Sequence, residues 1–164
     1  MKRRKSLNRN YIDPRITSVS LDANALDDCV ICNNKCVEKI CMLNQNLSEY
    51  RICFKLPYLV KHEIAHANTP KSVKNRANGF IYTNKTPLNS DESEQLEALE
   101  IHFRGNGVGN RHDADSNHIF EVIKYGGGYF ITEDKRIREK SKELNLFALS
   151  RHEFMPVLEK FEIL

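Results

Sequence analysis

The sequence has no apolar run that approaches the about 20 residues a membrane-spanning helix requires. No apolar segment follows the basic start of the chain, which argues against a secretory signal. The five cysteines are an odd number, and in a chain with no export signal they are expected to be reduced thiols. The sequence also has no internal repeat and no low-complexity segment. We therefore expect a cytoplasmic protein of 164 residues with one folded domain and no membrane partner.

Positive charge is concentrated at the start of the chain. Five of the 25 lysines and arginines precede residue 10, and no acidic residue lies among them. The rest of the chain carries a slight excess of acidic residues, so the basic character belongs to an arm at residues 1–14. This arm is either a phosphate-seeking tail for nucleic acid or a solvated, solubilising end. Residues 15–164 are expected to form the folded domain.

Short β-prone segments alternate with helical patterns along most of the chain. Strands are predicted at residues 16–21, 50–58, 129–132 and 146–150. Helical patterns cover residues 23–46, with a break near 33–34, and residues 59–68, 90–103, 113–128, 133–145 and 152–161. Residues 79–84 read as a small hairpin. Strands that alternate with helices are typical of a parallel sheet covered on both faces.

Several acidic residues fall where such a sheet binds ligands. Asp22 directly follows the first predicted strand, and Asp134 follows the third by two residues, which places both at the carboxyl ends of strands. Glu63 lies in the helix after the second strand, and Asp115 lies near the start of a later helix. Taken singly, such residues are usually helix caps or solvated side chains. Together they would repel one another unless a divalent cation neutralised them, and oxygen ligands suit Mg²⁺ or Mn²⁺.

Four segments, in order, resemble the acidic motifs of the PIN-domain nucleases. VSLDANAL resembles the first motif, PYLVKHEI the second, and DSNHIFEVIKYGGGYFITEDKRI the third and fourth. The resemblance spans residues 16–149 and implies a three-layer α/β/α sandwich with a central, mostly parallel sheet of four or five strands. It also implies an Mg²⁺- or Mn²⁺-dependent endoribonuclease that hydrolyses RNA phosphodiester bonds. Residues 69–110 would be an insert in this domain.

The same resemblance implies a role for each matched residue. The residues expected to bind the cation and act in catalysis are Asp22, Glu63, Asp115 and Asp134. Two residues are expected to orient carboxylates or water: Asn24 and Thr132. Asp113 is either a helix cap or a supplementary ligand. Three basic residues beside Asp134 are either RNA contacts or a solvated helix face: Lys135, Arg136 and Arg138.

Further partners are implied by the type of PIN protein that the chain resembles. Stand-alone members of this size resemble VapC-type toxins, which a small antitoxin protein restrains and which are often dimers. We therefore expect RNA as the substrate, with a small antitoxin and a second copy of the chain as candidate partners. A catalytically inactive module of the same fold that binds RNA or protein is an alternative.

A second alternative comes from residues 62–66, which read HEIAH and fit the zinc signature H-E-x-x-H of metallopeptidases. On a helix the two histidines would share one face. A peptidase also needs a third ligand, for which a later helix offers Glu92, Glu94, Glu97 and Glu100. The helix with HEIAH is short, because Thr69 and Pro70 follow it, and a peptidase would leave the aspartates without a joint role.

Four cysteines form a second apparent metal motif, C-x₂-C-x₃-C-x₄-C: Cys29, Cys32, Cys36 and Cys41. On one continuous helix the last of them would point about 120° away from the other three. Four such ligands cannot close around one ion, and structural zinc sites usually pair two knuckles across a longer spacer. We expect buried apolar thiols, with zinc or iron–sulfur binding as the alternative.

Overall fold

Five parallel strands form the centre of the molecule. The computed structural model describes residues 17–29, 34–45, 52–105, 113–124, 128–144 and 146–160. The strands of its sheet are β1 (Thr17–Leu21), β2 (Ile52–Leu56), β3 (Ile81–Tyr82), β4 (Tyr129–Ile131) and β5 (Phe147–Leu149). Every neighbouring pair is parallel, and the strand order is β3-β2-β1-β4-β5. The predicted α/β fold with a central parallel sheet is confirmed.

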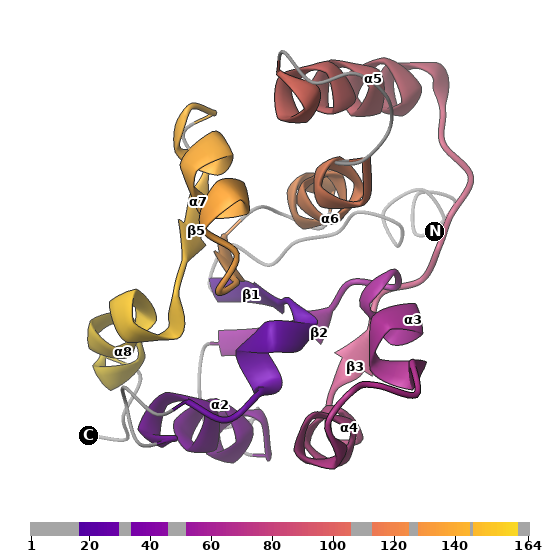
Figure 1. Ribbon diagram of the computed structural model, residues 1–164. Helices are drawn as coiled ribbons and strands as arrows, with labels where there is room; N and C mark the ends of the chain where they lie inside the picture. Colours follow the sequence, from indigo (N-terminus) through magenta and orange to yellow (C-terminus); the bar gives the residue numbers. More distant parts are fainter. Residues whose placement is uncertain are drawn as a thin grey trace, which may run out of the picture.

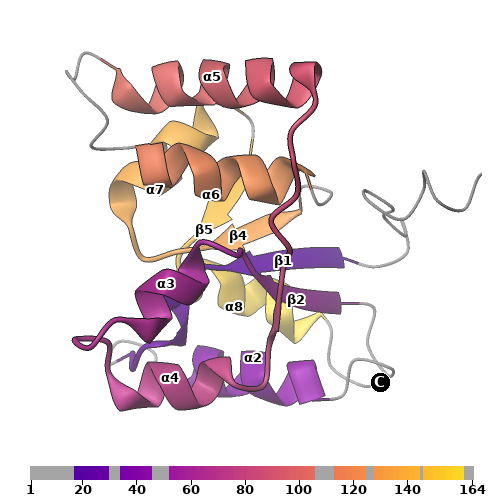
Figure 2. The same cartoon turned by 90° about the vertical axis from the view of Figure 1, so that its right-hand side faces the viewer.

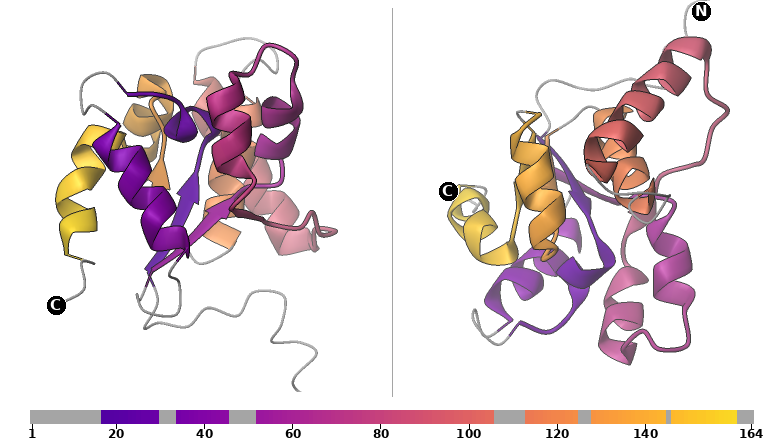
Figure 3. Two further views of the ribbon diagram at one scale, coloured as in Figure 1. Left: turned by 90° about the horizontal axis from the view of Figure 1, so that it is seen from below. Right: turned by 45° about the horizontal axis from the view of Figure 1, so that its top comes forward.

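Helices cover both faces of this sheet, so the fold is a three-layer α/β/α sandwich (Figure 1). One layer consists of α5 (Ser90–Arg104), α6 (Asp113–Lys124) and α7 (Lys135–Lys142). The opposite layer consists of α2 (Lys35–Gln45), α4 (Lys71–Ala77) and α8 (Arg151–Glu159). Figure 2 shows these layers above and below the strands, with α5 on the outer side of α6. The left panel of Figure 3 shows α2, α4 and α8 from below, in front of the strands.

Each helical layer packs against the sheet through its own apolar core. The first core joins β1 and β2 to α2, α4, α8 and the short helix α3 (Val60–Ala65), and it includes Phe54 and Phe154. The second core joins α5, α6 and α7 to β4 and β5, and it includes Phe103 and Phe130. Successive side chains of a strand point to opposite faces, so the neighbours Phe130 and Ile131 belong to different cores. This double burial explains why β4, which reads YFI, is apolar throughout.

The strand order reverses between β1 and β4. The chain runs outward from β1 through β2 to β3, and β4 then takes the other side of β1. The backbone N–H of Asp22 donates to the carbonyl oxygen of Ile131 at 2.9 Å, which ties the ends of these two strands together. The short 3₁₀ helix η1 (Ala23–Leu26) and α3 lie at this end of β1 (Figure 2). In open α/β sheets, the carboxyl ends of strands at such a reversal are the usual place for a ligand.

The hairpin predicted at residues 79–84 was wrong. Ile81 and Tyr82 form β3, which pairs in parallel with Lys55 and Leu56 of β2 and so forms one edge of the sheet. Parallel strands need a crossover connection, and α4 is part of the one between β2 and β3. The turn at Gly79 then leads from α4 into the edge strand. Part of the segment expected as an insert, residues 69–110, thus contributes α4, β3 and α5 to the sheet and its cores.

Among the described residues of the cysteine motif, helix begins only after the break predicted near residues 33–34. Asn34 adopts a left-handed backbone conformation with φ 60°, and α2 begins at Lys35. Cys29 lies before this break, so the argument that placed it on one helix face with Cys36 was wrong. Cys36 is fully buried in the first core, as expected of an apolar thiol, and Cys41 is half-buried beside it. Cys32 and the basic arm at residues 1–14 lie outside the described residues.

Within the part of the chain that the structure describes, no helix combines the length and the apolar composition needed to cross a bilayer.

Candidate metal centre

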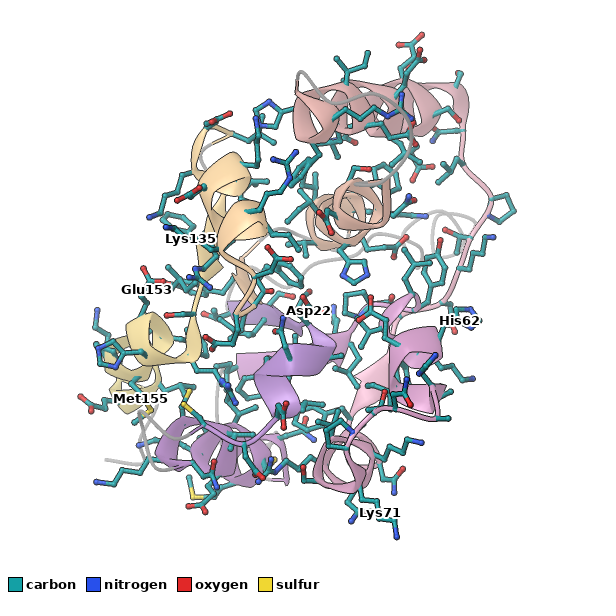
Figure 4. All side chains as sticks on the ribbon, in the orientation of Figure 1. Asp22, His62, Lys71, Lys135, Glu153 and Met155 are labelled. Atoms are coloured by element: carbon teal, nitrogen blue, oxygen red, sulfur yellow. The ribbon has the colours of Figure 1, made fainter. Side chains whose placement is uncertain are left out.

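Three side chains from three different elements meet at the carboxyl end of β1. Asp22 ends the strand and caps η1, with its Oδ1 accepting a hydrogen bond from the Ala23 N–H at 2.8 Å. Glu63 comes from α3, and His118 comes from α6 on the opposite side of the sheet. One ligand atom from each of the three residues lies within 4.8 Å of the others. Figure 4 shows the labelled Asp22 at the centre of this region, where η1 leaves the sheet.

The three side chains differ in their access to solvent. The side chains of Asp22 and His118 are 8% and 4% exposed, whereas that of Glu63 is 46% exposed. Nε2 of His118 lies 3.4 Å from Oε1 of Glu63, and Nδ1 lies 3.9 Å from Oδ1 of Asp22. Neither ring nitrogen forms a hydrogen bond to any described residue. The cluster is therefore buried on the side of Asp22 and His118 and accessible to solvent on the side of Glu63.

Electrostatic effects couple these three groups. Burial raises the pKa of the Asp22 carboxyl, and the charge of Glu63 raises it further, although His118 and the Thr132 hydroxyl oppose this. Burial lowers the pKa of the His118 ring most strongly of all single causes, but Glu63, Asp22 and Asp115 together outweigh it and raise the pKa. Negative charge on two carboxylates and a neighbouring aspartate thus calls for a positive charge at this point. A protonated ring or a bound cation would each relieve the repulsion between the carboxylates.

Two polar residues fix the orientation of Asp22. The Thr132 hydroxyl, fully buried at the end of β4, donates to Oδ2 of Asp22 at 2.8 Å. The Asn24 amide lies 3.4 Å from that oxygen and also 3.4 Å from the Thr132 hydroxyl oxygen. The side-chain oxygen Oδ1 of Asn24 accepts a hydrogen bond from the backbone N–H of Glu133 at 3.0 Å, which ties η1 to the loop after β4. Asn24 and Thr132 are thus the two side chains in contact with Oδ2 of Asp22.

The other three acidic residues of the sequence prediction are placed differently. Asp134 caps α7, because its Oδ1 accepts from the N–H groups of Arg136 and Ile137 at 2.9 and 3.2 Å. Asp115 lies one helical turn before His118 in α6, close enough for its charge to raise the pKa of that ring. Asp113 is the first residue of α6, and its side chain lies outside the described part.

The three basic residues considered as RNA contacts also have distinct surroundings. Arg136 donates to the carbonyl oxygen of Phe103 and so joins α7 to α5. Arg138 donates to the carbonyl oxygen of Thr132 at 3.0 Å. The side chain of Lys135 is 80% exposed, and its only described ion pair is with Glu139, one turn along α7. Of the three, Lys135 is thus the side chain that projects toward solvent, as Figure 4 shows.

A cavity of about 420 Å³ adjoins the candidate metal centre. Its walls come from η1, from α3 and from the turn that leads to α4. Polar groups from Asn24, Asp27 and Glu63 line it together with apolar atoms of Pro70 and Val73. The most exposed of the three clustered side chains, Glu63, therefore faces a space that a substrate could enter.

The HEIAH motif does not form the helical pair that zinc binding requires. α3 ends at Ala65, and His66 is its C-cap with an extended backbone, φ −62° and ψ 142°. The ring of His66 instead accepts a hydrogen bond from the backbone N–H of Asn68 at 3.1 Å through Nδ1. His62 lies on the exposed outer side of α3, away from Asp22 (Figure 4). Of this motif, Glu63 belongs to the cluster with Asp22 and His118, whereas His66 lines the adjoining cavity without joining that cluster.

His118 is the site residue that the sequence prediction missed. It stands in an apolar stretch of a helix, where a histidine is most simply a core residue. The available signal was its spacing: it follows Asp115 by three positions, which puts both on one face of α6. A search of known protein-family models and a search of curated protein sequences found no match to this chain.

Proposed function

We propose that the protein is a metal-dependent endoribonuclease of the PIN type that hydrolyses RNA phosphodiester bonds. The observation that carries this proposal is the convergence of Asp22, Glu63 and the buried His118 at the carboxyl end of β1. This is where the strand order reverses, the usual ligand position in an open parallel sheet. The four ordered motifs of the sequence give the proposal its family, and the cytoplasm is its expected location.

The residues present fit a divalent cation. Two carboxylates offer oxygen ligands, and the repulsion between them is one that a cation relieves. Oxygen ligands from Asp22 and Glu63 suit Mg²⁺ or Mn²⁺, the ions expected from the sequence. When bound, such an ion lowers the pKa of a coordinated water and offsets negative charge on a phosphate. Asp115 and Asp134, which lie farther out, remain in the proposal as residues that bind through water.

Each residue of the site has a task that follows from its position. Asp22 is fixed by Thr132 and Asn24, so it supplies an immobile ligand. Glu63 is half-exposed beside the cavity, so its free oxygen positions the attacking water and accepts its hydrogen bond. Lys135 extends into solvent from the first turn of α7 and contacts RNA phosphates in this scheme. The basic arm at residues 1–14 adds attraction for the backbone of the nucleic acid.

The same strand order also occurs in dinucleotide-binding folds, which use a different turn after the first strand. Those folds need glycines there so that the backbone can approach a pyrophosphate. In this chain the turn reads Asp22-Ala23-Asn24, and the Asp22 carboxylate occupies the end of the strand. A carboxylate repels a pyrophosphate unless a cation lies between them. The turn therefore favours metal-assisted chemistry.

The antitoxin and the second copy of the chain are proposals carried by the resemblance alone. The zinc peptidase lacks support from the geometry of α3, because the helix ends at Ala65 and His66 is no longer helical, so the two histidines are not one turn apart on a helix. An inactive binding module shares the fold, and only a test of activity separates it from a nuclease.

The test is RNA cleavage by untagged full-length protein, with metal removed and then restored as Mg²⁺ or Mn²⁺. We expect Asp22→Asn to lower the cleavage rate at least about 100-fold, because it removes the charge of the most rigidly held ligand. The matched control is Asp91→Asn, the same change on an exposed residue of α5, which should cleave at the wild-type rate. Absence of metal-dependent cleavage in the wild-type chain would support the binding module, and equal rates for Asp22→Asn and wild type would exclude this site.

A further inference from the structure

We infer that His118 supplies a nitrogen ligand to the cation, so that the centre binds Fe²⁺, Co²⁺ or Zn²⁺ more tightly than Mg²⁺. This inference rests on the metal centre of the proposed function, but it does not require that RNA be the substrate. It changes the chemical class of the cation from the oxygen-seeking ions expected from sequence to ions that accept imidazole. Imidazole strengthens binding of divalent ions in the order Mn²⁺, Fe²⁺, Co²⁺, whereas Mg²⁺ demands oxygen ligands.

The first argument is the unsatisfied ring of His118. Buried polar groups nearly always have a hydrogen-bond partner, and a buried imidazole usually donates to a carbonyl or a carboxylate. The ring is 4% exposed, yet neither nitrogen has a hydrogen-bond partner among the described residues. Its nitrogens instead face Glu63 and Asp22 at 3.4 and 3.9 Å. Three ligand groups that lie within 4.8 Å of one another, around a ring that forms no hydrogen bond, are spaced as ligands are around an ion.

The second argument is that the ring is held in place from behind. Phe130 of β4 contacts it edge-to-face, with ring centroids 6.2 Å apart and an interplanar angle of 82°. The residues that follow it in α6, Ile119 and Phe120, are buried in the second core. The helix therefore cannot turn without disturbing that core, and the ring is presented to the carboxylates in a fixed orientation. Such preorganisation is what a ligand position requires.

One other arrangement would explain the same geometry. A protonated ring between the carboxylates would act as a buried counter-ion and take the position of the metal. The two arrangements differ in a measurable way, because only a ligand nitrogen couples magnetically to a paramagnetic ion bound at the centre. They also differ in how much the affinity for Co²⁺ falls when the ring is replaced by the neutral amide of His118→Gln.

Electron spin echo envelope modulation of the Mn²⁺-loaded protein reports this coupling. We expect ¹⁴N modulation from one imidazole in the wild type, its replacement by the ¹⁵N pattern after labelling with ¹⁵N-histidine, and its loss in His118→Gln. The control is His152→Gln, the same change at an exposed histidine of α8, which should keep the coupling. The labelled wild type gives the answer even if His118→Gln does not fold. Bound Mn²⁺ without nitrogen coupling overturns the inference, as does a protein that binds no ion.

Titrations then measure the preference between ions. We expect the wild type to bind Co²⁺ at least about tenfold more tightly than Mg²⁺, and His118→Gln to weaken Co²⁺ binding about 10- to 100-fold. Mg²⁺ binding should change less than about threefold, because it depends on the carboxylates. Nitrogen coupling without RNA cleavage would reject the proposed nuclease and keep this inference. If the wild type and His118→Gln both cleave RNA and neither shows nitrogen coupling, the proposed nuclease is kept and this inference is rejected.

Discussion

At the scale of single residues, the hydroxyl of Thr132 is the contact that fixes the central carboxylate. It donates to Oδ2 of Asp22 at 2.8 Å from a fully buried position at the end of β4. We predict that Thr132→Val, which keeps the shape and removes the hydroxyl, lowers RNA cleavage and metal affinity about 10- to 100-fold, as loss of a ligand's hydrogen-bond partner does. Thr132→Ser restores the hydroxyl and should recover most of both. Cleavage rates and metal titrations measure this, and an equal loss in Thr132→Ser would show that packing matters more than the hydrogen bond.

The HEIAH motif offers a second test at the residue scale. His62 is exposed on α3, and His66 lies outside that helix as its C-cap. We predict that His62→Ala cleaves RNA within about twofold of wild type, because exposed side chains away from a site usually contribute little. A zinc peptidase would depend on this histidine, so His62→Ala would then lose both zinc and peptide hydrolysis. The measurement is RNA and peptide hydrolysis with matched metal loading.

How far the sequence predicted the site also follows from individual residues. Asp22 could be placed because it follows an apolar strand, and strand direction alone puts it at the carboxyl edge. His118 could not be placed in this way, because its role depends on how α6 is rotated above β4, which is set by packing of the second core. Asp134 has a sequence context that suits a cap and a ligand equally well, and hydrogen bonds to two N–H groups of α7 show that it caps the helix.

At the scale of elements, a buried polar network joins α6 to the segment between β3 and α5. Glu121 of α6 is 5% exposed and lies 3.4 Å from the Thr83 hydroxyl, and Lys124 contacts Thr86 and lies 3.6 Å from Glu92. Burial raises the pKa of the Glu121 carboxyl, an effect that Lys124 and Thr83 only partly oppose. The ionised form of Glu121 is therefore the one that the fold disfavours.

This network predicts a specific pH dependence of stability. Because the pKa of Glu121 is raised on folding, its contribution to the free energy of unfolding is full below the unfolded pKa and is lost as pH rises through the folded pKa. We predict that Glu121→Gln removes this loss, so its advantage over wild type grows from acidic to neutral pH. Urea denaturation of metal-free protein at several pH values measures it. The control is Glu94→Gln on the exposed face of α5, and parallel pH profiles for Glu121→Gln and wild type would contradict the prediction.

The individual strands and helices show which parts of the fold can be predicted from sequence patterns. Alternating strands and helices predicted a parallel sheet, because only a crossover helix connects parallel neighbours. β3 was missed as a parallel strand since it has two residues, one of them 62% exposed, and no apolar alternation marks it. It becomes a strand through its parallel pairing with Lys55 and Leu56 of β2, a tertiary contact that the local sequence does not mark.

At the scale of the whole molecule, the candidate metal centre lies where the two apolar cores meet. Asp22 and Glu63 come from elements of the first core, whereas His118 comes from a helix of the second. α5 is outermost, yet it is tied to α7 because Arg136 donates to the carbonyl oxygen of Phe103 and His102 lies 3.0 Å from the carbonyl oxygen of Lys140. The layer of α5, α6 and α7 is thus linked internally by hydrogen bonds and packed on β4 and β5 through the second core, and it should unfold together with the rest of the domain.

Phe103 tests this coupling between the layers. Its ring is fully buried in the second core at the inner side of α5, so we predict that Phe103→Ala lowers the free energy of unfolding by about 3–5 kcal/mol. Unfolding should remain a single transition when followed by circular dichroism and by tyrosine fluorescence. The matched control is Phe147→Ala on β5, where the side chain is 63% exposed and loses mainly its contact with Tyr129, which should cost about 1 kcal/mol or less. Two separate transitions in Phe103→Ala would show that the layer carrying His118 is a separate folding unit, and the centre would then assemble only after the two units dock.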